Sequence, residues 1–151
     1  MIRLVSKLAA LAALAICAAA AAAPVSSLKA EHGWVRWLPA NLPAAGYVVI
    51  RNNGDKPVKL TGAESTDYGM VMLHRSMQKS GSDSMEMVDA ITVPAHGDVA
   101  LAPGGYHLML MNAKHAIKPG DRVNVSLHFD DGETIQATLP VRPANASSAS
   151  D

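Results

Sequence analysis

The sequence is poor in cysteine, with Cys17 as the only one in 151 residues. Cys17 lies in the apolar segment near the N-terminus, so a chain cleaved after Ala23 would contain none. A chain without cysteine can form no disulfide and has no thiolate for catalysis or metal binding. This excludes cysteine-dependent chemistry and the thiolate-ligated blue-copper type of redox site.

The sequence also lacks an excess of charge of either sign. Its 13 Lys and Arg residues balance 13 Asp and Glu residues. Removal of Arg3 and Lys7 with the first 23 residues lowers the basic count to 11 and leaves a formal net charge of −2. Nucleic-acid binding depends on a basic surface that neutralises phosphates. The composition therefore argues against a nucleic acid as partner.

Only one long apolar run is present, and it begins directly after Arg3 and Lys7. Residues 8–23 are apolar, end in three alanines and precede Pro24, as in a secretory signal peptide. The run is shorter than the roughly 20 residues of a membrane span. We therefore expect a cleaved signal peptide at residues 1–23 and no stable membrane insertion of the mature chain.

A lipoprotein signal with Cys17 as the lipidated residue is the alternative. Ile16 stands where such a signal needs a small residue, and Cys17 lies inside the apolar run, so the cleaved signal is favoured. One domain is expected over residues 24–142. The small, polar residues 143–151 predict a disordered tail.

The mature chain alternates short strand-like runs with turns rich in Gly, Pro, Asn and Asp. Turn signals at roughly ten-residue spacing are typical of antiparallel β-sandwiches. Residues 79–84 are expected to form a polar loop. The expected strands are residues 31–38, 45–52, 58–65, 71–76, 85–88, 91–93, 98–101, 106–111, 122–129 and 134–141.

Aromatic residues are few, with Phe used once, but methionine occurs eight times, and seven of the eight lie between Met70 and Met111. Within this segment, His74 and Met85 are separated by ten residues, Met85 and His107 by twenty-one, and His107 and Met109 by one. Imidazole and thioether are neutral, soft ligands that suit Cu(I). A single Met usually fills a core and a single His is usually a surface residue, so only the group suggests a metal site.

Strand alternation brings these residues together. Successive side chains of a strand point to opposite faces, so His107 and Met109 share one face of residues 106–111. His74 and Met72 share one face of residues 71–76, and the loop that follows can bring Met85 over the same patch. Met87 is a candidate auxiliary ligand, while Met72 and Met111 are expected to shield the site. The remaining histidines, at positions 32, 96, 115 and 128, are expected to be surface or structural residues.

The segment resembles the periplasmic copper(I) chaperone family that assembles the copper A centre of cytochrome c oxidase. The four-residue spacing matches that family's pattern without a gap. The family's sequence motifs around these residues are matched as well, by VPAHG (93–97), LAPGGYHLMLM (101–111) and KPGD (118–121). The resemblance implies a cupredoxin-like Greek-key β-sandwich or barrel that binds Cu(I) through His74, Met85, His107 and Met109. It also implies a non-enzymatic, periplasmic protein.

The implied partner is the copper A-bearing oxidase subunit, reached directly or through a thiol-dependent copper chaperone. A copper buffering or tolerance protein that delivers nothing is the alternative. Two departures from the family pattern are clear. Arg75 stands where many members have a Met after the first His, so its charge could weaken binding or help release. The tail 143–151 has no His or Met, which argues against the Cu(II)-binding extension of some relatives.

Overall fold

The computed structural model describes residues 26–150, and the predicted signal peptide lies outside them. Ten β-strands and no helix occur in this part of the chain, which confirms the all-β class. Between residues 26 and 150, no helix is long and apolar enough to cross a membrane. The strands are β1 Leu28–Arg36, β2 Ala44–Asn52, β3 Val58–Ser65, β4 Tyr68–Lys79, β5 Ser82–Met87, β6 Ile91–Val93, β7 Gly97–Leu101, β8 Tyr106–Ala113, β9 Arg122–Phe129 and β10 Thr134–Arg142.

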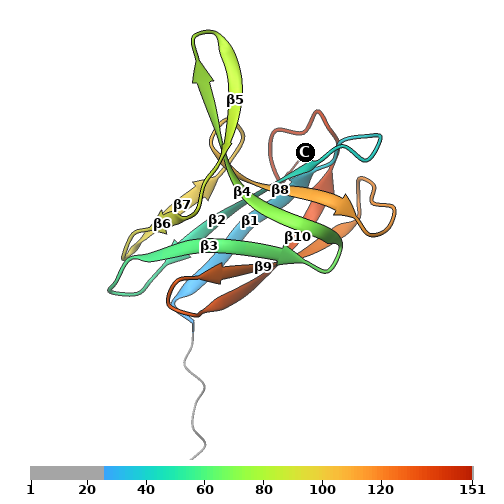
Figure 1. The fold of residues 1–151 in the computed structure, drawn as a ribbon. Coiled ribbons are helices and arrows are strands. Elements are labelled where there is room, and N and C mark those ends of the chain that lie inside the picture. The colour runs from blue at the N-terminus through green and yellow to red at the C-terminus, as the bar shows by residue number, and fades with distance from the viewer. Residues whose placement is uncertain (1–25, 151) are drawn as a thin grey trace, which may run out of the picture.

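The strands pack in two layers (Figure 1). One layer has the order β5-β4-β8-β2-β1, with β7 also paired to β2, and the other has the order β10-β9-β3-β6. Strands β1 and β10 pair in parallel and join the layers into one continuous path, whereas the other neighbours are antiparallel. The expected cupredoxin-like β-sandwich is thus confirmed.

Strand β9 shows how alternation in the sequence builds the core. Every second residue of β9 is buried and apolar, while the residues between them are polar and lie on the outer face. An antiparallel sheet with one wet face has this pattern. The buried side chains of both layers form one continuous core, whose fully buried members include Val35, Ile50, Leu60, Leu108 and Leu127.

The segment expected to be a polar loop is instead the tip of a hairpin. Strand β4 runs to Lys79 and β5 begins at Ser82, so only two residues connect them. Both, Ser80 and Gly81, have positive φ angles of 52° and 80°, as in the type I′ turn that fits two-residue hairpins. The β4–β5 hairpin projects beyond the two layers (Figure 1), and every residue of β5 is exposed.

The C-terminal residues 143–150 also differ from the disordered tail expected from composition. Ala146 is buried against Trp34 and Tyr47. The carbonyl of Ala146 accepts a hydrogen bond from Arg36 Nε at 3.1 Å. The carbonyl of Ala149 accepts one from Arg142 Nε at 2.9 Å. The segment is therefore held to β1 and β10 by hydrogen bonds to its backbone oxygens, and it packs on Trp34 and Tyr47 through Ala146.

Leu108 provides a test of the core beneath β8. It is fully buried, whereas Leu42 is 55% exposed. Truncation of a buried Leu removes apolar contacts and leaves a cavity, so Leu108→Ala should lower the free energy of unfolding by about 2–5 kcal/mol. Leu42→Ala, the matched control, should change it by no more than about 0.5 kcal/mol. Urea unfolding of both variants measures the difference, and equal effects would contradict the packing described here.

Candidate metal centre

The candidate ligands lie on the outer face of β4 and β8, two neighbouring antiparallel strands. Leu73 and Leu108 point into the core and are buried. The alternate positions therefore point outward. Their register places His74 directly across from His107 and Met72 directly across from Met109. The structure thus brings together three of the four predicted ligands, His74, His107 and Met109, on adjacent strands.

His107 is held in one orientation by the backbone. Its side chain lies on the outer face and yet is only 5% exposed. Its Nδ1 lies 3.2 Å from the carbonyl oxygen of Gly105, which can only accept, so we assign the proton to Nδ1. The same oxygen accepts the Ser76 N–H at 3.0 Å. This arrangement leaves the Nε2 lone pair of His107 free to bind a cation.

His74 has an unsatisfied nitrogen. The His74 and His107 ring centroids are 5.8 Å apart, and the rings are inclined at 62°. Nδ1 of His74 is buried and has no hydrogen-bond partner among the described residues. A buried polar atom without a partner is costly and calls for an explanation. A metal ion bound at this Nδ1 would supply one, so the site's chemistry fits a cation that prefers nitrogen and sulfur.

The third strand, β5, carries two thioethers toward the same face. Met87 is the register partner of His74, and Met85 is the partner of Ser76, two pairs further toward the hairpin tip. Both are well exposed, at 63% for Met85 and 66% for Met87. Met85, the predicted ligand, thus lies diagonally from His74, while the predicted auxiliary Met87 lies straight across. Both are within the reach of a long side chain.

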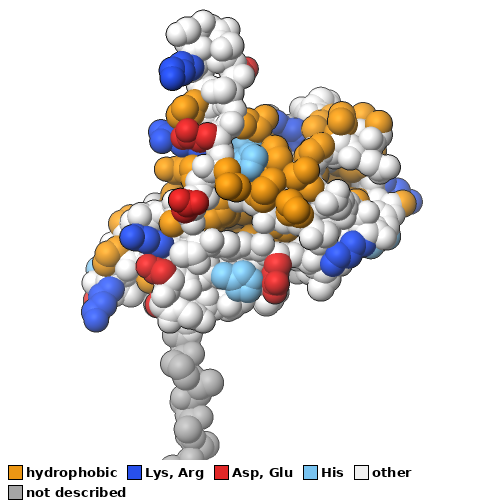
Figure 2. Space-filling view, viewed as in Figure 1, with side chains coloured by type: hydrophobic (Ala, Val, Ile, Leu, Met, Phe, Trp, Pro, Cys, Tyr) orange, Lys and Arg blue, Asp and Glu red, His pale blue; other side chains and the backbone are white. Residues whose placement is uncertain are grey.

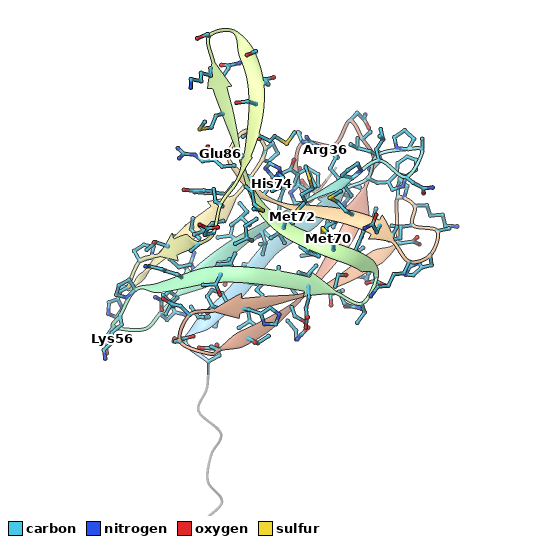
Figure 3. All side chains as sticks on the ribbon, in the orientation of Figure 1. Arg36, Lys56, Met70, Met72, His74 and Glu86 are labelled. Carbon is cyan, nitrogen blue, oxygen red and sulfur yellow. The ribbon has the colours of Figure 1, made fainter. Side chains whose placement is uncertain are left out.

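A row of methionines continues the site along β4 and β8. The register pairs Met70 with Met111, beside the pair Met72 and Met109. Figure 3 shows Met70, Met72 and His74 following one another along β4. In Figure 2, a His side chain lies within a patch of hydrophobic side chains over these strands. Met70 had no place in the sequence prediction, because the strand was expected to begin only at Val71.

Arg75 lies on the other side of β4 from the ligands. Its guanidinium carbon lies 5.5 Å from the ring centroid of Tyr106, its register partner on β8. Its register partner on β5 is Glu86. Neighbouring residues of a strand face opposite ways, so Arg75 points away from the His74 side. The sequence suggested that the charge of Arg75 weakens copper binding. Because Arg75 points away, this geometry reduces its repulsion of a bound cation.

Three other histidines lie beside carboxylates at the surface, as expected for structural residues. In the described part of the chain, no group of three or more His, Cys, Asp or Glu side chains is arranged to hold a metal ion. The three histidine–carboxylate pairs at the surface are His96 Nε2 with Asp55 at 2.8 Å, His115 Nε2 with Asp67 at 3.0 Å and His128 Nε2 with Glu64 at 3.5 Å.

Comparison with known proteins places the chain among related sequences and structures. Residues 28–141 match the family model described as "Putative lipoprotein LpqE-like". "Putative lipoprotein Lxx21020" of Leifsonia xyli subsp. xyli is 31% identical over 116 residues, which are 76% of this chain and 69% of that protein.

Two solved structures are similar over most of the chain. The apo PCuAC domain of PmoF2 superposes with a TM-score of 0.67 at 27% identity, covering 82% of this chain and 96% of that one. The solution structure of CuI-DR1885 from Deinococcus radiodurans gives a TM-score of 0.61 at 33% identity, covering 86% and 85%. The fold of this chain is therefore that of PCuAC domains.

The protonation of two histidines tests the geometry. Burial lowers the pKa of His107, the hydrogen bond to the Gly105 carbonyl opposes that shift, and the charge of a protonated His74 adds to it. For His115, the hydrogen bond to Asp67 raises the pKa. We expect the His107 Cε1–H resonance of the apo protein to titrate below the usual value of about 6.5 and that of His115 above it.

The lowered pKa of His107 has a consequence for stability. A lowered pKa of His107 in the folded state means that this imidazole contributes stability above about pH 6.5, and the contribution is lost as pH falls through the folded-state pKa.

Asp67→Asn should move the His115 pKa down toward its usual value and leave that of His107 unchanged. Reversed titration order of the two histidines would contradict the described burial and pairing.

Proposed function

The chain belongs to the LpqE-like family, and from that premise we propose that it is an exported, non-enzymatic Cu(I) chaperone. The proposed ligands are His74, Met85, His107 and Met109. One observation carries the proposal: two imidazoles lie across from each other, next to thioethers, and one of them has a buried nitrogen without a partner. The match to structures that include a Cu(I) form supports the choice of metal.

The proposed ligands lie on strands of different exposure: three lie on the paired strands β4 and β8, and one lies on the exposed edge strand β5. His74, His107 and Met109 lie on β4 and β8, which are paired along seven residues. Met85 lies on β5, which is fully exposed and pairs only with β4. In this proposal, an incoming partner ligand displaces the Met85 thioether first. The copper then passes to the partner by stepwise ligand exchange and is never free in solution.

The neutrality of the ligands makes the ion exchangeable. Thioethers do not titrate in the physiological range, and both imidazoles must be neutral to bind. The ion's charge is left uncompensated in the carrier, which favours transfer to a partner with anionic ligands. Because burial lowers the pKa of His107, this ligand remains available to copper below the usual His pKa.

We propose the copper A centre of a terminal oxidase as the destination, reached directly or through a thiol-dependent copper chaperone. The spacing of the four ligands and the sequence motifs around them, which resemble those of the copper A assembly family, support this target. Copper buffering without delivery is the second candidate. It is favoured by the exposure of the methionines, which suits rapid uptake of Cu(I) from the surroundings.

The proposed location is the periplasm, entered with a cleaved signal peptide. The descriptions of the matched family and of the Leifsonia relative as lipoproteins favour the alternative, in which Cys17 carries a lipid anchor. In either case, the first strand of the folded domain begins at Leu28, and the proposal places this domain outside the cytoplasm. Mass spectrometry of the protein purified from its own membrane or periplasmic fraction distinguishes a lipid-modified Cys17 from cleavage after Ala23.

Cu(I) binding to the mature protein is tested by anaerobic titration against a chromophoric chelator. We expect one tight equivalent, which the His107→Ala/Met109→Ala variant loses because two of its ligands are gone. Met77→Leu is the matched control, since Met77 pairs with Ser84 and lies on the face opposite His74. An unchanged affinity in the double variant would show that copper binds elsewhere.

The same titration distinguishes the two methionines of β5. Loss of a thioether ligand weakens the site, so Met85→Leu is expected to lower Cu(I) affinity by at least tenfold and Met87→Leu by less. The reverse order would assign the ligand to Met87, the register partner of His74.

Delivery is tested by mixing the Cu(I)-loaded protein with an apo oxidase subunit containing the copper A domain. The copper A absorption is expected, with or without a thiol-bearing chaperone, once two equivalents of the loaded protein have delivered two Cu(I) ions and ferricyanide has removed one electron from the pair. A deletion strain should lose oxidase activity at low copper. Copper sensitivity with unchanged oxidase activity would instead support buffering.

A further inference from the structure

Four thioethers form the corners of a square on the outer face of the sheet. Met70 and Met72 lie two residues apart on β4, and their register partners Met111 and Met109 lie on β8. Cross-strand partners have Cβ atoms about 4.5–5.5 Å apart, and residues two apart on a strand are separated by about 6.6 Å. The flexible side chains can therefore bring their sulfur atoms to one point between the strands.

Packing does not account for this square. The inward positions are Val71 and Leu110, between these methionines, and Leu73 and Leu108, beside them, and all four provide core contacts. Met70 is 47% exposed, and its three companions are half-buried. The wet face of an antiparallel sheet usually has polar side chains, and a contiguous apolar patch there indicates a function.

The square has the chemistry of a soft-metal site. Thioether sulfur carries lone pairs that Leu and Val lack, and it selects Cu(I) over hard cations. The nearest cationic side chain on β4, Arg75, is on the opposite face, beside Tyr106. Met109 is common to the square and to the His74–His107 pair, so the two groups of ligands meet at one residue.

We propose that Met70, Met72 and Met111 bind a second Cu(I) ion, with Met109 at its border with the first site. The second ion is held more weakly, because only thioethers bind it, without an imidazole, and the ion in the first site repels it. The shared Met109 lets copper pass between the two sites by exchange of one thioether at a time. This inference goes beyond the proposed delivery function and does not depend on the identity of the recipient.

Silver(I) is the probe for the first experiment, since it is soft and closed-shell like Cu(I) and is not oxidised in air. Native mass spectrometry of the mature protein gives the stoichiometry. The ε-methyl resonances of 13C-labelled methionine show which thioethers are bound. The wild type should bind two equivalents, and the weaker one should shift the methyl groups of Met70, Met72 and Met111.

Two variants and a control separate this site from the first one. Met70→Leu/Met111→Leu conserves apolar volume and should remove the weaker equivalent while retaining the tighter one. His74→Ala/His107→Ala should lose the tighter equivalent and retain binding at the methionine square. Met77→Leu, on the opposite face, should still bind two. Cu(I) titration under chelator competition should reproduce both stoichiometries.

The proposal is overturned by either of two results. One is a wild-type protein that binds a single equivalent with no shift of the Met70 and Met111 methyl groups. The other is a weaker equivalent that persists in the Met70→Leu/Met111→Leu protein, which would mark it as adventitious. Loss of the tighter equivalent alone, in the histidine variant, bears on the proposed chaperone site and leaves the square intact.

Discussion

The candidate metal centre depends on the register between β4 and β8. Because side chains alternate along a strand, a slip of one residue would move His74 or His107 from the outer face into the core. The register is fixed by Leu73 and Leu108, which are register partners and buried on the inner face. The burial of apolar side chains beneath the sheet therefore determines which side chains meet above it.

The sheet gives the proposed ligands two different mechanical environments. The strand β8 lies between β4 and β2. Met109 has register partners on both neighbours, and His107 is paired with His74 on β4. The strand β5 is at the edge, has no buried residue and, within residues 26–150, pairs only with β4. Local opening costs least where few apolar contacts must be broken. Strand β5 can thus open from β4 at low cost, while the pairing of β4 with β8 keeps His74 across from His107.

Much of this arrangement could be predicted from the sequence. Strands with strict alternation, such as β9, were predicted with the observed bounds, and the spacing around His107 placed it beside Met109 on one face. The start of β4 was missed because Gly69 weakens a strand pattern, whereas pairing with β8 extends the strand back to Tyr68. The position of Met70 beside Met111 was missed for the same reason.

Other features depend on contacts that side-chain identity does not reveal. The relation of Met85 and Met87 to His74 follows from the register of a hairpin, which its two-residue turn fixes. The turn residues, Ser80 and Gly81, do not form one of the strongest hairpin signals, so the segment was expected to be a loop. The tail around Ala146 is held by its backbone carbonyl, an acceptor that every residue has.

The charge of the ligands gives the proposed transfer its direction. Imidazoles and thioethers leave the single positive charge of Cu(I) unbalanced, and burial makes that charge more costly at His107 than at the exposed Met85. In a recipient site, a thiolate neutralises the charge of the ion and is a softer ligand than imidazole. Copper would therefore move from the carrier to such a recipient with a favourable free energy. The exposed hairpin provides the point at which the incoming ligand can attack.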